Sequence, residues 1–290
     1  MSFHHETRAQ VIADSVNPDG VRLTTFEVTF HRFILAEVNT HRRFSRNSAS
    51  SRAIPLETML ERAIEHPALP LEWPCEQRGM SGGMSLTGDD LLDAQRTLEF
   101  IRYSTTQTLK EYIARHPDKT TRLHKSLLNR PLEWFMWHTA IISSTEWTNM
   151  FKQRIHIDAQ PEFFELAWLM SRALNESTPE ELNYGEWHVP YISDEDKDVL
   201  TVEEQVKIST ARCARVSYLT HDGQRDYIED MRMFNETLWH KGHWSPMEHP
   251  AVAVNRKNYP AISSNFDPGW HQYRVFAETG MNIWDDSWDS

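Results

Sequence analysis

Residues 41–52 read His-Arg-Arg-Phe-Ser-Arg-Asn-Ser-Ala-Ser-Ser-Arg and contain four arginines, one histidine and four serines. They directly follow an apolar, strand-like stretch, and a fully solvated loop has no need of so many forked cations beside so many hydroxyl groups. Guanidinium forks and hydroxyls together satisfy many acceptor oxygens at once, as a phosphate and a polarised heterocycle require. This arginine-rich segment therefore predicts a binding site for a ligand of that kind.

The remainder of the chain is acidic, with 30 Lys and Arg against 42 Asp and Glu and a formal charge of −12. The basic segment is therefore local, and the overall charge argues against a general nucleic-acid binder. No apolar run approaches the length of a membrane span, and the N-terminus lacks the apolar core of a signal peptide. The two cysteines, Cys75 and Cys213, have no metal-type spacing. We expect a cytoplasmic protein, in the host cytoplasm if the gene is viral.

Hydrophobic periodicity predicts one strand, several helices and two polar connections. The strand covers Arg22–Glu37, and the arginine-rich segment follows it as a loop. Helices are predicted at Leu56–Glu65, Asp89–Arg115, Pro161–Asn175 and Gln224–Lys241, and Leu123–Ser143 reads as two helical pieces around Pro131. Loops are predicted at Pro67–Gly88 and, as an acidic linker, at Ser193–Asp198. We expect a single α+β domain over residues 1–290, with helices packed around a modest antiparallel sheet.

Three segments resemble the flavin-dependent thymidylate synthases. Thr40-His41-Arg42, then Ser50 after seven residues and Arg52 two further on, resemble the family's Arg-His-Arg signature. Residues 149–154, with Ala-Gln at 159–160, are similar to its closing section, and residues 214–218 and 243–249 to its opening section. Because the opening section comes last here, the order implies a circular permutation, with residues 1–192 carrying the signature and 199–290 equivalent to the family's N-terminus. His249 should then lie beside the strand at Thr24–Glu37.

This resemblance implies C5 methylation of dUMP to dTMP, with methylenetetrahydrofolate supplying the carbon, FAD the hydride and NADPH the reduction of FAD. It also implies a homotetramer with sites at subunit interfaces. The residues implied to be catalytic are Arg154, which would polarise the base, and Ser50, which would act by binding the nucleotide and not as a nucleophile. The residues implied to bind substrate are Glu37, Arg42, Ser50, Arg52, Lys125 and Arg154. Those implied to bind FAD are His41, Arg42, Arg43, Asn149, Ser217, His243, Ser245 and Glu248.

The chain departs from the family pattern at several positions. Thr40 replaces the first arginine of the signature, while Ser143 and Thr145 occupy two positions of the family's flavin contacts. Arg43 and Arg46 are plausible replacements for the missing cations. A glutamine and an acidic residue of the family are replaced by Glu37 and Ser48, which favours another pyrimidine nucleotide or a hydroxymethyl product as an alternative.

Two further alternatives come from other classes of protein. One is a catalytically silent nucleotide-binding relative that has lost the flavin, which Thr40, Ser143 and Thr145 favour. The other is a zinc site built from His240, His243, Glu248 and His249. Their spacing fits none of the strong zinc signatures, so we expect no metal.

Overall fold

The computed structural model describes residues 6–79, 82–216, 226–255, 265–266 and 269–280. A five-stranded sheet in the order β3-β4-β2-β1-β5 forms its centre, and a second, three-stranded sheet has the order β6-β7-β8. All neighbouring strands run antiparallel except β1 and β5, which pair in parallel. The strands are β1 Arg8–Val16, β2 Arg22–His31, β3 Ser45–Ser48, β4 Trp137–Ser144, β5 Glu180–Glu181, β6 Trp187–His188, β7 Ala251–Ala253 and β8 Trp270–Gln272.

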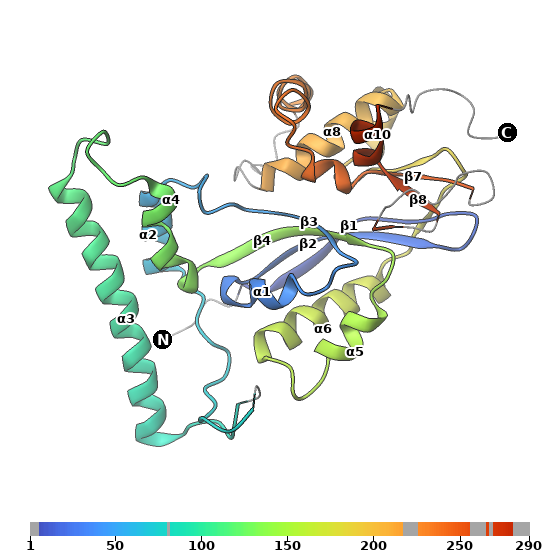
Figure 1. Ribbon diagram of the computed structural model, residues 1–290. Coiled ribbons are helices and arrows are strands. Elements are labelled where there is room, and N and C mark those ends of the chain that lie inside the picture. The colour runs from blue at the N-terminus through green and yellow to red at the C-terminus, as the bar shows by residue number, and fades with distance from the viewer. Residues whose placement is uncertain (1–5, 80–81, 217–225, 256–264, 267–268, 281–290) are drawn as a thin grey trace.

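Helices cover both faces of the five-stranded sheet, so the predicted α+β class is confirmed. In Figure 1, α5 and α6 lie below the sheet, α8 and α10 lie above it, and the long α3 lies at the far left. The α-helices are α1 Leu35–Val38, α2 Leu56–Glu65, α3 Gly88–Arg115, α4 Lys125–Leu128, α5 Thr148–Arg154, α6 Pro161–Glu176, α7 Asp194–Val199, α8 Val202–Arg215, α9 Tyr227–Arg232 and α10 Tyr273–Thr279. The 3-10 and π turns are η1 Arg32–Ile34, η2 Arg130–Phe135, η4 Met233–Trp239 and η5 Ser245–Glu248.

Side chains along β2 alternate between the two faces of the five-stranded sheet. Phe26, Val28 and Phe30 are fully buried and face the core cluster that includes α6. Successive strand residues point to opposite faces, so Thr25 and Thr29 face the other layer. The predicted strand is confirmed only as far as His31, because the chain then turns through η1 and α1 instead of continuing to residue 37.

The prediction of two helical pieces over Leu123–Ser143 is wrong for its second half. Residues 125–135 do form α4 and η2, but Trp137–Ser144 is β4, which pairs with both β2 and β3. Ala140, Ile141 and Ile142 are all buried because helices or loops cover both faces of this strand. Such a strand is apolar on both sides and cannot be distinguished from a buried helix by its periodicity.

Several other boundaries differ from the predictions. The acidic segment at residues 193–198 is not a linker, because Ser193 and Asp196 form a capping box that begins α7. The helix predicted over 224–241 consists of α9 followed by the π turn η4. Within α6, the periodicity predicts that Phe164 faces inward, but Phe163 is buried and Phe164 is 38% exposed. The arginine-rich segment, predicted as a loop, contains the short strand β3.

Long α3 confirms the helix predicted at 89–115 from apolar residues that recur at three- and four-residue steps, but most of these residues are not buried. Only Thr106 and Leu109 of its described side chains are buried, and Ile101 is 46% exposed. The loop predicted over 67–88 is confirmed apart from one isolated β-bridge between Pro74 and Ser85 and the two positions 80–81, which lie outside the described residues.

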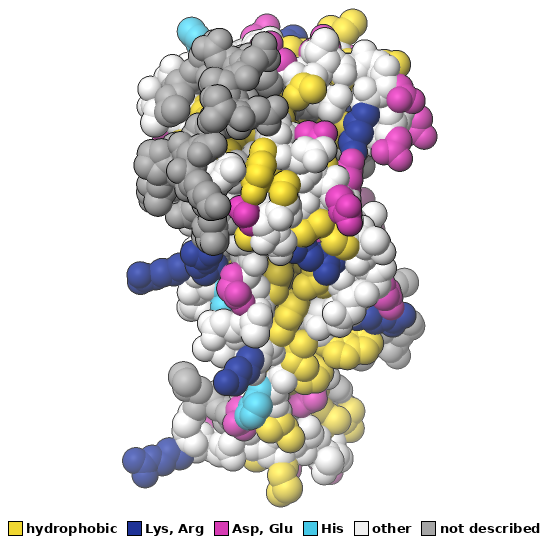
Figure 2. All heavy atoms as spheres, turned by 90° about the vertical axis from the view of Figure 1, so that its right-hand side faces the viewer, with side chains coloured by type: hydrophobic (Ala, Val, Ile, Leu, Met, Phe, Trp, Pro, Cys, Tyr) yellow, Lys and Arg dark blue, Asp and Glu magenta, His cyan; other side chains and the backbone are white. Residues whose placement is uncertain are grey.

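The face of the molecule at the β1–β2 hairpin mixes acidic and basic side chains, and no continuous basic surface crosses the described part of it (Figure 2). Among the described residues, no helix is long and apolar enough to cross a bilayer. The acidic C-terminal residues 281–290 lie outside the described residues.

Candidate functional site

A cavity of about 780 Å³ lies where the arginine-rich segment meets the C-terminal part of the chain. Ser50 and Arg52 reach it from the loop after β3, and His243 and Ser245 reach it from the turn that begins η5. Two segments that are nearly two hundred residues apart in sequence therefore form one cavity. The other lining residues are Asn47, Ala53, His124, Ser126, Ala214, Leu238, Gly242, Trp244, Pro246 and Arg274.

The polar lining of this cavity consists mainly of hydrogen-bond donors. Arg52 and Arg274 contribute guanidinium groups and His124 and His243 contribute imidazoles, while no Asp or Glu is among the lining residues. Such a lining is unusual in a chain of formal charge −12. The Arg274 guanidinium is paired with the carboxylates of Glu248 and Glu278, whereas Arg52 has no ion pair among the described residues. A guanidinium of that kind beside hydroxyl groups favours an anion, above all a phosphate with its several acceptor oxygens.

Buried amide and hydroxyl groups hold the two segments together. Gln272 Nε2 donates to Ser45 Oγ at 2.7 Å and to the Glu248 carbonyl at 2.7 Å, so one side chain of β8 joins β3 to η5. Asn47 Nδ2 donates to the Cys213 carbonyl at 2.8 Å, which ties β3 to α8. The Gln272 and Asn47 amides thus have partners in the interior, and these hydrogen bonds hold β3, η5 and α8 together at the cavity wall.

Glu248 and Lys125 lie next to this cavity rather than among its lining residues. The Glu248 carboxylate is paired with the Arg274 guanidinium, which lines the cavity. Lys125 Nζ donates to the Ala53 carbonyl at 2.6 Å, immediately after Arg52. Both side chains thus support groups of the cavity, Glu248 by orienting Arg274 and Lys125 by holding the loop that carries Arg52.

His41 and Arg154 form a second group of candidate residues outside the cavity. Arg154 Nε donates to His41 Nε2 at 3.2 Å, and its guanidinium lies 4.5 Å from the ring centroid of Phe163. Burial, together with the charges of Arg154 and Arg46, lowers the pKa of His41 to about 4. His41 is therefore neutral at pH 7, and its Nε2 accepts a hydrogen bond from Arg154 Nε–H. Arg154 of α5 therefore contacts His41 of the arginine-rich segment, but it does not line the cavity that contains Ser50.

The remaining candidates are dispersed. Arg42, Arg43 and Asn149 are exposed, and none of them lines the cavity. Glu37 lies in α1, where its Oε2 atom is buried without a hydrogen-bond partner among the described residues. Ser217 lies outside the described residues.

His249 belongs to a buried chain of hydroxyls and imidazoles beneath the site. Its Nδ1 lies 2.8 Å from Ser143 Oγ, which lies 2.7 Å from Thr25 Oγ1 on β2. Thr25 in turn lies 2.7 Å from His188 Nε2, whose Nδ1 lies 2.9 Å from Ser15 Oγ. The expected position of His249 beside the strand at Thr24–Glu37 is thus confirmed.

This buried chain also explains two features of the sequence. Ser143, at a position where the resemblance implied a flavin contact, is fully buried and hydrogen-bonds to His249 and Thr25 in the interior. His249 is engaged by Ser143 and Glu248 by Arg274, so two members of the zinc alternative have other partners. Among the described residues, no group of three or more His, Cys, Asp or Glu is placed to hold a metal ion.

Sequence reasoning missed Arg274, Trp244 and Asn47 as residues of the site. Trp244 Nε1 is buried without a hydrogen-bond partner among the described residues, in a side chain that lines the cavity. Asn47 lies within the arginine-rich segment, directly after Arg46, and could have been found as an amide in that basic stretch. Arg274 follows an aromatic run in the C-terminal section, and no local pattern distinguishes it from a surface cation.

Comparisons with known proteins give no match to a protein-family model and none to a curated protein. Among solved structures, the chain is similar to a UMP/dUMP methylase, PolB from Streptomyces cacaoi. For the form bound with 5-Br UMP, the TM-score is 0.46 at 13% identity, covering 60% of this chain and 90% of that one. For the form bound with 5-Br dUMP, it is 0.45 at 14% identity, covering 61% and 93%. The function proposed below rests on the residues of the site.

Proposed function

We propose that this protein is a circularly permuted relative of the flavin-dependent thymidylate synthases that methylates a pyrimidine nucleotide, dUMP, at C5. The C5 hydrogen leaves as a proton and a methyl group replaces it. Methylenetetrahydrofolate supplies the carbon, and NADPH supplies the hydride through FAD, so tetrahydrofolate and NADP⁺ are the other products. No cysteine is assigned to attack the ring, so donors aimed at developing negative charge would provide the catalysis.

The observation that carries this proposal is the cavity formed by Ser50, Arg52, His243 and Ser245 without any acidic lining residue. A phosphate is the group that best matches such a lining. The segments that meet there resemble two sections of one family, its Arg-His-Arg signature and its opening section, although they lie far apart in this chain. Their meeting is expected if the chain is a permuted form of that family.

FAD fits the donor set of the same cavity. A buried indole N–H without a partner, Trp244 Nε1, is available to an acceptor of a ligand. Arg274 and His243 would bind pyrophosphate oxygens, and Glu248 would keep Arg274 oriented toward them. When bound and reduced, FAD supplies the hydride of the reaction.

The position of Arg154 supports a site shared between subunits. Within one chain, Arg154 contacts His41 and does not line the cavity that contains Ser50 and Arg52. The role proposed for Arg154, polarising the base, is then possible if the Arg154–His41 group of one subunit faces the cavity of another. We therefore propose a homo-oligomer, a homotetramer by resemblance, with its reaction sites at the interfaces.

The test is a visible absorption spectrum of the purified protein with FAD, followed by titration with dUMP. We expect a bound-flavin spectrum that shifts with dUMP, and an Arg52→Gln variant that binds dUMP at least about tenfold more weakly, since a charge-assisted hydrogen bond contributes roughly 1.5–3 kcal/mol. Arg96→Gln, at an exposed position of α3, is the matched control. Absence of any flavin binding would instead favour the catalytically silent nucleotide-binding relative.

A related activity on dCMP is the second candidate, and Glu37 is the reason. Its buried Oε2 has no partner among the described residues, and a carboxylate accepts hydrogen bonds where the family's glutamine can also donate. The exocyclic amine of cytosine would satisfy this acceptor, whereas the carbonyl of uracil would not. Turnover with dCMP in preference to dUMP, reversed in Glu37→Gln, would support this candidate, and preference for dUMP in both proteins would exclude it.

A further inference from the structure

Ser50 and Arg52 enter the cavity of about 780 Å³ from one turn, residues 50–53. A hydrogen bond from the Ala53 N–H to the Ser50 carbonyl at 2.9 Å closes this turn, and the Ser51 side chain between the two lining residues is only 2% exposed. A polar turn at the surface has many accessible conformations unless the remainder of the fold holds its backbone groups. The directions of Ser50 and Arg52 therefore depend on the contacts that hold this turn.

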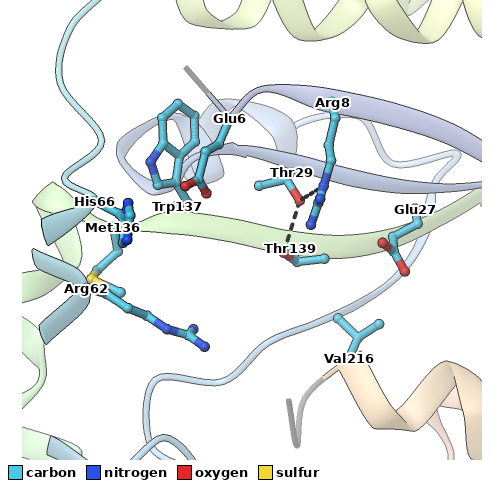
Figure 3. A pocket seen from close by; sticks show the side chains of 10 residues that line it. All are labelled: Glu6, Arg8, Glu27, Thr29, Arg62, His66, Met136, Trp137, Thr139 and Val216. Atoms are coloured by element: carbon cyan, nitrogen blue, oxygen red, sulfur yellow. Dashed lines mark hydrogen bonds between the residues drawn. The ribbon is translucent and has the colours of Figure 1, made fainter. Parts of the chain in front are cut away.

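The central sheet fixes the chain just before the turn. The Ala49 N–H donates to the Thr139 carbonyl of β4 at 3.1 Å. Thr139 lies in the wall of a second cavity, of about 380 Å³, where its hydroxyl is 3.1 Å from that of Thr29 on β2 (Figure 3). This contact holds residue 49, so the turn that follows depends on contacts from another side.

Asn129 holds the turn from the side of α4. Its Nδ2 atom donates to the Ser51 carbonyl at 2.6 Å and to the Ile54 carbonyl at 3.0 Å, so the two hydrogen bonds bracket Arg52 and Ala53. Asn129 is fully buried, and its Oδ1 atom has no hydrogen-bond partner among the described residues. A primary amide has two N–H donors on one nitrogen, which lets one side chain bind two carbonyls. Both donors of Asn129 are thus used on the turn.

The segment around Asn129 also belongs to another wall of the cavity. Asn129 directly follows α4, and His124 and Ser126 line the cavity from the beginning of that short helix. The Ser51 hydroxyl, in turn, is hydrogen-bonded to the Glu133 carboxylate of η2. Residues 124–133 therefore form one wall and fix the turn that forms the next, with the Asn129 amide as a buried link between the two.

We propose that Asn129 is a positioning residue of the nucleotide site, and that its two donated hydrogen bonds hold the turn so that Ser50 and Arg52 face the phosphate. Asn129 is not among the residues that line the cavity, so it acts through the turn and not through contact with the ligand. The nucleotide as ligand rests on the function proposed above, whereas the ordering of the turn does not depend on it.

The first test compares two buried amides by isothermal titration calorimetry with dUMP. Asn129→Leu keeps a side chain of similar size and removes both donors, and we expect it to bind dUMP at least about tenfold more weakly, since two carbonyls lose their hydrogen bonds. The matched control is Asn17→Leu, because Asn17 is also buried and donates to a carbonyl, that of Gly269 at 2.9 Å, without lining the cavity. Urea unfolding measures the stability of both variants. The control should retain its dUMP affinity within about twofold, and an equal loss of affinity in both variants would show a general effect on stability and overturn the proposal.

The pH dependence of a second variant, Asn129→Asp, which keeps the shape of the side chain, tests the donor itself. A carboxylate only accepts hydrogen bonds, whereas a protonated carboxyl group donates one. Burial raises the pKa of a carboxyl group, so the deficit in dUMP affinity relative to the unaltered chain should shrink as the pH falls from about 8 to about 6. A deficit of the same size at every pH would count against the donor role and overturn the proposal.

Hydrogen exchange of the Ala53 amide separates this proposal from the proposed function, because it needs no nucleotide. Exchange should be at least about tenfold faster in Asn129→Leu than in the unaltered chain, and unchanged in Asn17→Leu. If the unaltered chain binds no dUMP, the proposed function is refuted, and faster exchange at Ala53 still supports the positioning role. Unchanged exchange at Ala53 in Asn129→Leu would refute the positioning role whatever the ligand.

Discussion

Acidification should unfold this protein through its buried histidines, and His249 allows the size of the effect to be calculated. Burial is the main cause that lowers the pKa of His249 to about 3, from an ordinary value of 6.5. Between these two values the unfolded chain binds a proton that the folded chain does not. The free energy of unfolding therefore rises with pH in this range, and it is lost as the pH falls from about 6.5 toward about 3.

The magnitude follows from the shift. One proton of difference corresponds to about 1.4 kcal/mol per pH unit well below 6.5, so His249 alone should remove about 2 kcal/mol between about pH 7.5 and about pH 5. Burial likewise lowers the pKa of His188 to about 3, and its effect has the same sign. Against a typical stability of roughly 5–15 kcal/mol, these two residues make the protein strongly acid-sensitive.

The assay is urea unfolding followed by tryptophan fluorescence at several pH values in that range. His249→Gln should be less stable than the unaltered chain at neutral pH, because the contact with Ser143 is disturbed. The difference between the two proteins should then shrink by about 2 kcal/mol at about pH 5. His240→Gln, at an exposed position, is the control. Equal pH dependence in the unaltered and His249→Gln proteins would refute the account of a buried neutral imidazole.

Two further predictions concern other charged contacts. Arg154→Ala should raise the pKa of His41 from about 4 toward its ordinary value, because Arg154 is one of the charges that lower it; NMR titration of the imidazole measures this, and an unchanged value would contradict the contact. Arg212→Met should destabilise the protein by about 3–5 kcal/mol, because Asp196 and Asp230 would remain buried without this cation. Urea unfolding measures it, and a loss below about 1 kcal/mol would show that the two carboxylates find other partners.

Much of the site could be predicted where chemistry is concentrated in a short segment. Ser50 and Arg52 stood out because cations and hydroxyls gather there within an acidic chain, and both line the cavity of about 780 Å³. His243 and Ser245 were found through resemblance, and they line the same cavity. Arg274 and Trp244 were not found, because a single arginine or tryptophan forms no sequence motif. Only the fold places them in the wall of the cavity.

Secondary structure divides in the same way. The helix at Gly88–Arg115 and the start of β2 were predicted because one face of each differs from the other. Strand β4 was mistaken for a helix because both of its faces are buried. Hydrophobic periodicity can identify a helix or strand only when one face is apolar and the other polar. The secondary structure of a segment that is apolar on both faces depends on the elements that pack against it.

By itself, the sequence predicted the α+β class and the donor-rich segment, and its resemblance to a known family predicted that His249 lies beside β2. Only the tertiary structure decided that Arg52 and Arg274 share one cavity while Arg154 pairs with His41 elsewhere. It also decided that Ser143 serves a buried hydrogen-bond chain. The reason is physical: the type of a side chain sets which groups it can bind, whereas the partner it meets depends on long-range packing of segments that local sequence does not encode.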